Sequence, residues 1–181
     1  TNSFNVKIES DNLLVGSDFS YELFVPGGFY WTPVTHDLNL SLYGFYNSEL
    51  FNGYNFSTAF RSGYISIFPS ENRMRAQNLV EEDIKNRHYP FISLSMGLSK
   101  AVDRFEFDTW IMNTMRAPMI EELYSDGPHL GSYSYEIGEP NLELEKIYGV
   151  ESSCRYNTDI FKYSLTSFYN YSPYYYQMSK T

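Results

Sequence analysis

Apolar and polar residues alternate along most of this chain, and this period of two is the feature that most restricts its fold. Residues 4–9 read Phe-Asn-Val-Lys-Ile-Glu, and residues 92–98 read Ile-Ser-Leu-Ser-Met-Gly-Leu. Successive side chains of a β-strand point to opposite faces of the sheet, whereas helical faces repeat every 3.6 residues. The pattern therefore predicts an all-β protein whose strands carry one apolar face and one polar face.

Eight segments alternate in this way, and the links between them are short and long in turn. The short links cover residues 10–12, 47–54, 100–103 and 157–159, and the long links cover residues 25–33, 69–89 and 116–144. In the second long link, residues 76–86 form either a short helix or an irregular loop. Short turns on one side and long loops on the other are typical of an antiparallel up-and-down transmembrane β-barrel, whereas a soluble sandwich mixes loop lengths at both ends.

The polar positions of the eight segments carry charges of both signs. These residues are Asp18, Glu22, Arg61, Glu106, Asp108, Glu151, Arg155 and Lys162. Inward charges of both signs fit a polar barrel lumen, although a soluble sandwich would also expose such a face to water. Aromatic residues make up 19% of the chain, most of them Tyr, and tyrosine suits a boundary between lipid and water.

Composition excludes several other classes of protein. The net charge is -9, from 13 basic and 22 acidic residues, and without a basic cluster a nucleic-acid partner is not expected. The one cysteine, Cys154, rules out an intrachain disulfide and a cysteine-based zinc site. The sequence contains no run of ~18 apolar residues, so we do not expect a transmembrane helix. The sequence carries no phosphate loop, dinucleotide motif or nucleophile elbow, so we do not expect an enzyme.

The third long link carries an ordered set of motifs. They are Met-Arg-Ala-Pro at residues 115–118, Glu-Leu-Tyr at 122–124, Tyr-Glu-Ile-Gly at 135–138 and Glu-Pro-Asn-Leu-Glu-Leu-Glu at 139–145. This set resembles the most recognisable loop of the TonB-dependent outer-membrane receptors. The final segment, Ser-Phe-Tyr-Asn-Tyr at 167–171, is similar to that family as well. The chain departs from the family pattern at Met115, where an aromatic residue is usual, and at Glu139, where Asn is usual.

The resemblance implies that residues 1–181 are about eight strands of one larger, 22-stranded barrel domain. The chain opens inside a strand pattern with no signal peptide, which suggests a fragment, and the family's plug domain and TonB-contacting segment are absent from it. The implied function is active uptake of an iron chelate, a siderophore or haem, across the bacterial outer membrane. Outer-membrane lipid and the TonB complex are the implied partners, and no cofactor is expected apart from the transported chelate or haem.

Five residues of this loop are candidate ligand contacts. Some haem receptors of the family place a histidine between the two boxes, so His129 is a candidate haem-iron ligand, since imidazole suits haem iron; the alternative is a solvated or structural histidine. Tyr124, Tyr133 and Tyr135 would contact a chelate or stack on a porphyrin, or pack the loop itself. Arg116 would bind an anionic chelate, or pair with a carboxylate of the loop or lumen. Pro118 predicts a helical turn with acidic residues near its start.

Two other functions compete with the receptor. One is an intact small eight-stranded outer-membrane barrel with an adhesion or structural role. The other is a soluble β-sandwich that acts as a binding module.

Overall fold

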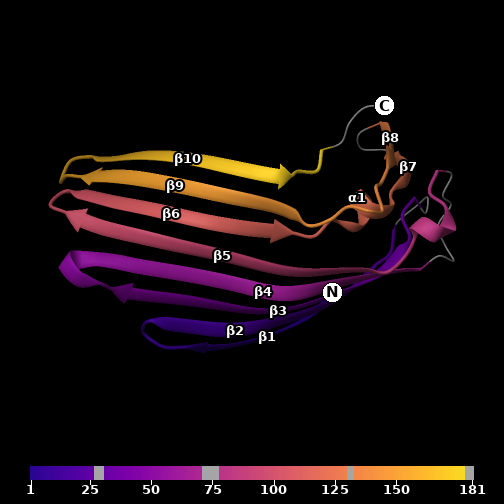
Figure 1. Cartoon of the computed structure of the whole chain (residues 1–181), viewed down its shortest axis with the longest axis horizontal. Helices are drawn as coiled ribbons and strands as arrows, with labels where there is room; N and C mark the ends of the chain where they lie inside the picture. The colour runs from indigo at the N-terminus through magenta and orange to yellow at the C-terminus, as the bar shows by residue number, and fades with distance from the viewer. Residues whose placement is uncertain (27–30, 71–77, 130–132, 178–181) are drawn as a thin grey trace.

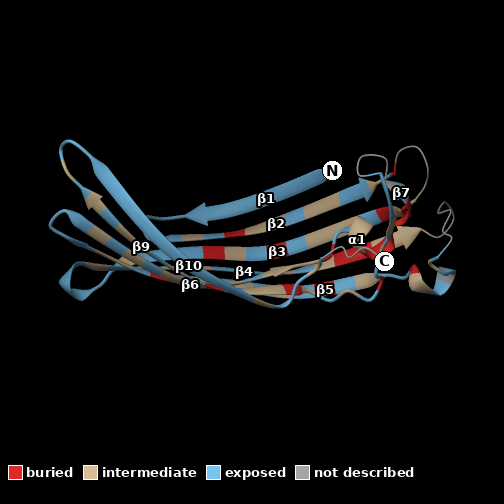
Figure 2. Cartoon of the chain, turned by 90° about the horizontal axis from the view of Figure 1, so that it is seen from above, coloured by how far each residue is buried: buried red, intermediate tan, exposed pale blue. Residues whose placement is uncertain are grey.

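Antiparallel β-structure dominates the chain. The structure is a computed structural model that describes residues 1–26, 31–70, 78–129 and 133–177. One sheet holds eight strands side by side in chain order, and both views show it as curved (Figures 1 and 2). Its strands are β1 (Asn2–Glu9), β2 (Leu13–Phe24), β3 (Val34–Glu49), β4 (Tyr54–Ser70), β5 (Arg87–Val102), β6 (Phe105–Arg116), β9 (Glu145–Asn157) and β10 (Lys162–Tyr174).

The eight predicted strands and the alternation of short and long links are confirmed. The turns 10–12, 50–53, 103–104 and 158–161 lie at one end of the sheet. The described parts of the long links, residues 25–26, 31–33, 78–86, 117–129 and 133–144, lie at the other (Figure 1). The predicted turn 47–54 is shorter because Asn47 and Ser48 remain paired with Ser57 and Phe56. The chain reverses at Asn52 and Gly53, whose φ angles of 59° and 72° are positive, as tight turns often require.

The long links contain the remaining elements. In the second link, only the 3₁₀ turn η3 (Glu81–Asp83) forms within residues 78–86. Of the two predicted alternatives for residues 76–86, the structure therefore shows the irregular loop. Residues 76 and 77 lie outside the described residues. The third holds the helix α1 (Ile120–Tyr124) and the hairpin of β7 (Asp126–His129) and β8 (Ser134–Ile137). The helical turn after Pro118 is confirmed, whereas the hairpin was not predicted. None of the described helices is long and apolar enough to cross a membrane.

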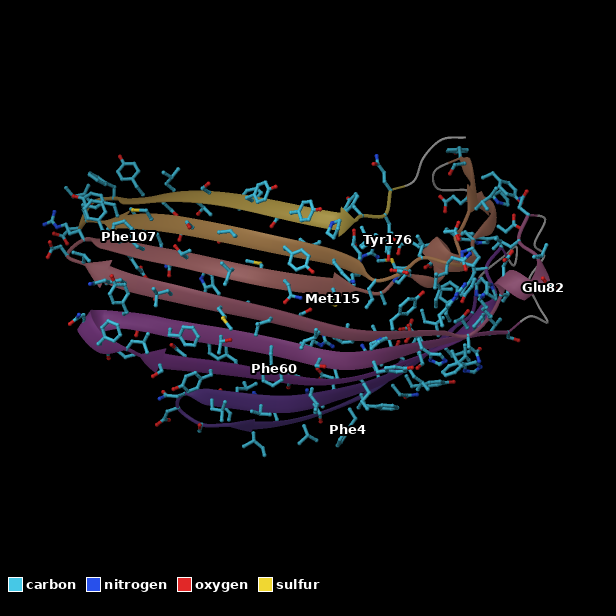
Figure 3. The ribbon with its side chains drawn as sticks, viewed as in Figure 1. Phe4, Phe60, Glu82, Phe107, Met115 and Tyr176 are labelled. Carbon is cyan, nitrogen blue, oxygen red and sulfur yellow. The ribbon has the colours of Figure 1, made fainter. Side chains whose placement is uncertain are left out.

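The register places one set of side chains on each face of the sheet. Phe4 pairs with Phe19, Phe19 with Leu40, and Leu40 with Tyr64, so these side chains share a face. This apolar face comprises the even-numbered residues of β1, β3, β4, β5 and β9 and the odd-numbered residues of β2, β6 and β10 as far as Tyr171. Four of its members are labelled in Figure 3: Phe4, Phe60, Phe107 and Met115.

The opposite, polar face carries the charged residues predicted for it. Arg61 lies 4.0 Å from a carboxylate oxygen of Asp18 and donates from Nε and Nη2 to the Ser41 hydroxyl (3.2 and 3.1 Å). Near the turn end, Arg155 pairs with Glu106 at 3.1 Å and also with Asp108. The apolar face has no such network, because none of its positions holds an Asp or Glu.

The sheet forks between β5 and β6 toward the long-loop end. Their pairing stops at Leu94 and Asn113, although β5 stays paired with β4 as far as Arg87. The Asn113 side chain ends the ladder, since its Oδ1 accepts from the Leu94 amide (2.9 Å) and its Nδ2 donates to the Ile92 carbonyl (3.1 Å). Pro90 lies beyond this point, where an unpaired strand edge tolerates a residue without an N–H.

The buried apolar cluster of the described residues lies beside this fork. It consists of Ile67, Tyr89, Leu123 and Tyr124, with Ile65, Ala117, Ile120, Leu142 and Leu144 packed against it. Ile65, Ile67 and Tyr89 belong to the polar face of β4 and β5, so residues 117–124 and 142–144 pack onto that face. Much of the buried chain in Figure 2 accordingly lies toward the long-loop end.

Candidate functional site

Arg116 joins both ends of the third long link. Its guanidinium donates from Nη1 and Nη2 to the two carboxylate oxygens of Glu122 (2.8 and 3.0 Å), and from Nε to Glu145 (2.6 Å). Glu145 is only 4% exposed, so its charge depends on this partner. The hydrogen bonds that Arg116 donates to Glu122 raise the pKa of Arg116 above its ordinary value, so the guanidinium stays charged. Burial raises the pKa of Glu122, but the hydrogen bonds that its carboxylate accepts from Arg116 and Met119 have the larger effect. The pKa of Glu122 is therefore lowered from its ordinary value.

The same carboxylate starts helix α1. The Met119 backbone N–H, at the N-cap position, donates to Glu122 Oε2 (2.7 Å), which satisfies one of the amides that a helix start leaves without a partner. Glu121 and Glu122 both lie in the first turn, where the helix dipole favours negative charge. The Arg-Ala-Pro and Glu-Leu-Tyr motifs therefore form one structural unit around Arg116.

Two tyrosine hydroxyls join the third long link to β5 and to the residues that precede β5. One belongs to helix α1, and the other bonds to the segment that follows the hairpin. Tyr124 is fully buried and donates to the Lys85 carbonyl (2.7 Å), and Tyr89 donates to the Leu142 carbonyl (3.0 Å). Burial raises the pKa of Tyr124 to about 12, so its hydroxyl remains a donor. Arg87 adds a bond from Nη2 to Asn141 Oδ1 (3.2 Å).

Asp126 connects all three long links. Its Oδ2 accepts from the backbone amides of Asn78 (2.6 Å) and Leu79 (2.9 Å), and its Oδ1 accepts from Asn78 Nδ2 (2.8 Å) and the Tyr135 hydroxyl (2.9 Å). Its own backbone N–H donates to the Trp31 carbonyl (2.8 Å). We call these five residues the loop hub.

The hub carboxylate is both buried and ionised. Asp126 is 2% exposed, and burial alone raises its pKa. The bonds from Leu79, Asn78 and Tyr135 outweigh burial and lower the pKa of Asp126 to about 2. A buried carboxylate that accepts several amide bonds favours its charged form in this way. The hub therefore holds the three loops in a fixed arrangement, and its carboxylate carries no proton to donate near neutral pH.

Close backbone contacts restrict two glycines next to the hub. A Cβ at Gly127 would lie 2.4 Å from the Trp31 Cβ, and one at Gly138 would lie 2.6 Å from the Leu123 carbonyl carbon. Either substitution would push apart the hairpin and its neighbour. The Gly of the Tyr-Glu-Ile-Gly motif therefore serves packing against α1.

The four predicted contact residues whose side chains are described, Arg116, Tyr124, Tyr133 and Tyr135, do not converge on one point. Tyr124 is buried in the cluster and Arg116 is held by two carboxylates, so for both the structure shows the packing or pairing alternative. Tyr135 is half-exposed and bonded to Asp126, whereas Tyr133 is 97% exposed at the tip of the hairpin. The two hairpin tyrosines are thus the ones with ring surface available to a ligand.

His129 belongs to the same hairpin, where its backbone pairs with Ser134 and Pro128 pairs with Tyr135. Its side chain lies outside the described part of the structure, so haem ligation stays a prediction from the resemblance. Within the described residues, no three His, Cys, Asp or Glu side chains are placed to hold a metal ion.

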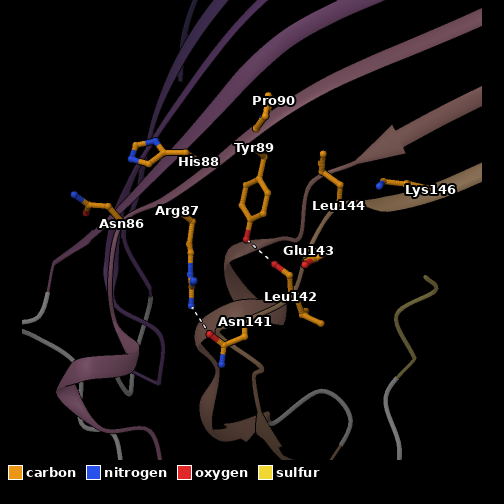
Figure 4. A pocket seen from close by; sticks show the side chains of 10 residues that line it. All are labelled: Asn86, Arg87, His88, Tyr89, Pro90, Asn141, Leu142, Glu143, Leu144 and Lys146. Atoms are coloured by element: carbon orange, nitrogen blue, oxygen red, sulfur yellow. Dashed lines mark hydrogen bonds between the residues drawn. The ribbon is translucent and has the colours of Figure 1, made fainter. Parts of the chain in front are cut away.

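A cleft of about 510 Å³ opens between the start of β5 and the segment that leads into β9. It is lined by Asn86, Arg87, His88, Tyr89, Pro90, Asn141, Leu142, Glu143, Leu144 and Lys146 (Figure 4). The Tyr89–Leu142 and Arg87–Asn141 bonds cross it. The cleft follows from the fork in the sheet, which residues 141–144 fill only in part.

Several residues that organise this site were not singled out from the sequence. Asn78 and Tyr89 act through partners 48 and 53 residues away, which no local pattern reveals. Asn113 was a detectable exception, since it is a polar residue at an apolar position of its strand. Such an exception is the signal that could have located the fork.

Known proteins give no further guide to this site. No protein-family model matches the chain, and no curated protein matches it in sequence.

The hub carboxylate should stabilise the loops in a pH-dependent manner. Its pKa is lowered from 3.8 to about 2, so its contribution is full above the unfolded value and is lost as pH falls from about 4 to 2. At ~1.4 kcal/mol per pKa unit, Asp126→Asn should cost about 2 kcal/mol at pH 7 and little at pH 2. Hydrogen exchange of the Leu79 amide measures this, by comparing variant and wild type at each pH.

Asp83→Asn is the matched control, because Asp83 accepts only a weaker bond from the Val80 amide (3.2 Å) outside the hub. It should leave the Leu79 amide protected at both pH values. If the Leu79 amide were equally protected in the wild type and in Asp126→Asn at pH 7, that result would contradict the stabilising role of the hub carboxylate.

The buried carboxylate of Glu145 should destabilise the fold when its partner Arg116 is removed. Arg116→Met leaves a buried carboxylate unpaired and should lower the free energy of unfolding by about 2 kcal/mol, and adding Glu145→Gln should restore part of it. Arg155→Met, which removes a more exposed arginine that also pairs with two carboxylates, should cost clearly less because water screens its ion pairs. Urea unfolding of the full-length protein measures all three, and equal losses for Arg116→Met and Arg155→Met would contradict the assignment.

Proposed function

We propose that this chain is part of the barrel of a TonB-dependent receptor, which takes up an iron chelate across the bacterial outer membrane. The observation that carries the proposal is the composition of the apolar face. The chain has 22 acidic residues, yet none occupies a position on that face, and its only Lys or Arg residues are Lys100 and Lys146, near opposite ends. A face in water has no reason to exclude carboxylates so completely, whereas a face in lipid does.

Aromatic rows at both ends of the apolar face support a membrane position. Tyr156 pairs with Tyr163 near the turn end, and Tyr148 pairs with Tyr171 near the long-loop end. Eight residues separate the two rows along β9, which is about 27 Å at ~3.4 Å per residue. At the usual strand tilt of about 40° this corresponds to a height of roughly 21 Å, comparable with the apolar band of about 25 Å that the aromatic girdles of membrane barrels flank. Each lysine lies near a tyrosine ring, Lys100 at 4.2 Å from the centroid of Tyr54 and Lys146 at 5.8 Å from that of Tyr174, as snorkelling lysines do.

The sheet is open, which favours a large barrel over the small one. β1 and β10 lie at its two edges and each pairs with one neighbour in the described chain. An intact eight-stranded barrel would close by pairing these two strands. Long unpaired edges invite further strands, and a larger barrel supplies them on both sides.

A sandwich is less compatible with the same sheet. A β-sandwich buries the apolar face of one sheet against a second, and the described residues contain no second sheet apart from the β7–β8 hairpin, which belongs to the link folded on the polar face. The apolar face is left exposed, with Ile8 at 77% and Leu165 at 75%. Lipid is the partner that fits so broad an apolar surface.

The polar face then lines the lumen, and the loop hub lies where a chelate would enter from outside. The motifs that resemble the receptor family supply Tyr135 of this hub and the pairing of Arg116 with Glu122 and Glu145. An ordered loop body above a polar lumen is the arrangement that selective uptake of a hydrophilic chelate requires. Substrate choice falls to the exposed hairpin tyrosines and the other long links.

Arginine substitutions on the two faces should separate lipid from water. Leu94→Arg places a charge in the middle of the apolar face and should cost about 2–4 kcal/mol in a bilayer. Ser95→Arg, at the next residue of β5 on the polar face, should cost far less because the lumen is wet. The measurement is the free energy of urea unfolding of the full-length protein from lipid vesicles. Equal costs, or assembly unaffected by Leu94→Arg, would contradict a membrane barrel.

A further inference from the structure

The fork between β5 and the β6–β9 pair leaves an opening in the sheet, lined mainly by residues of the apolar face, with Gly63 and Phe91 from the polar face. A second hollow, of about 380 Å³, is lined by Ser62, Gly63, Pro90, Phe91, Ile92, Met115, Leu144 and Lys146. It shares Pro90, Leu144 and Lys146 with the cleft described above. The two hollows therefore adjoin each other at the fork, and we call the two together the groove.

The two halves of this groove differ in chemistry. Ile92, Met115 and Leu144 line the part nearer the middle of the sheet, and Ile92 is 56% exposed. The outer part carries Lys146, His88 and the amides Asn86 and Asn141. In Figure 4 the Lys146 side chain points from β9 toward Leu144, at the junction of the two halves. An apolar slot with a cationic mouth is the shape of a binding site for an anionic amphiphile.

The polar groups at the mouth are arranged as donors. The Oδ1 of Asn141 accepts from Arg87, so its amide Nδ2 is directed to other partners. The His88 Nδ1 bonds to the Ser66 hydroxyl (3.1 Å), and when that hydroxyl donates, Nε2 carries the ring proton. The one carboxylate among the lining residues, Glu143, is exposed to solvent. Lysine is a common phosphate binder, and a basic residue near a membrane surface attracts anionic lipid.

We propose that this groove binds a phosphate-bearing lipid of the surrounding membrane, with an acyl chain along Ile92, Met115 and Leu144 and the phosphate at Lys146. The inference rests on the proposed membrane barrel, since only then does the groove open into lipid. Charge complementarity selects the occupant: the apolar face has no carboxylate, and Lys146 is its one formal charge at this end. A lipid in the groove would take the place of the strand contact that β5 and β6 lose beyond Asn113.

The test compares two lipids that differ only in the phosphate. Full-length protein in a neutral detergent is titrated with dioleoyl phosphatidic acid or with dioleoylglycerol, and native mass spectrometry gives the dissociation constants. Phosphatidic acid should bind more tightly, and Lys146→Gln should weaken it about fivefold, the effect of one lysine at a membrane surface. Glu143→Gln should tighten it, and Ile92→Trp, which fills the slot, should weaken both lipids.

Lys100→Gln is the matched control, because Lys100 is the other lysine of the apolar face and lies outside the groove. Equal binding of the two lipids, or equal weakening by Lys100→Gln and Lys146→Gln, would overturn the lipid site while leaving the barrel intact. Displacement of phosphatidic acid by inorganic phosphate alone at millimolar concentration would also overturn it, since binding would then not depend on an acyl chain in the slot. A full-length protein that remains folded in buffer without detergent would overturn the barrel and this inference together.

Discussion

The register of the backbone ladder is the constraint on which the rest of the structure depends. Tight turns such as Asp103–Arg104 fix how neighbouring strands pair, and a slip of one residue would exchange the two faces of a strand. With the observed register, Phe4, Phe19, Leu40 and Tyr64 form one apolar row while Asp18 and Arg61 meet on the other side. The division of charge between the faces, and with it the proposal of a lipid-facing surface, follows from that pairing.

Order at the long-loop end depends on a different kind of interaction. The buried apolar cluster is small, so ionic groups hold the loops instead. Asp126 accepts from the Leu79 amide of the second link and donates its own N–H to the Trp31 carbonyl of the first, and Arg116 joins the two ends of the third link. Such groups are costly to bury unless they are fully paired. Full pairing therefore makes the loop arrangement specific, which suits the proposed role in chelate uptake.

The strands could be predicted from the sequence because alternation is a local signal, and it placed β5 and β6 within a few residues of their ends. The hairpin β7–β8 could not, since its strands are four residues each and β7 contains Gly127 and Pro128, which normally indicate a loop. The site was predicted only in outline. The motifs located Arg116 and Glu145 but not their pairing, and the hub at Asp126 depends on Asn78 from another link, which sequence spacing does not reveal.

The central claim is that one face of the sheet lies in lipid and the other in water. Single-cysteine variants at residues 149–156 of β9, in a background without Cys154, can each carry an environment-sensitive fluorophore in vesicle-reconstituted full-length protein. The account predicts that a lipid-attached quencher acts at the even positions, such as Val150 and Cys154, and an aqueous quencher at the odd ones, such as Glu151 and Arg155. Quenching by the aqueous agent at even and odd positions alike would contradict it.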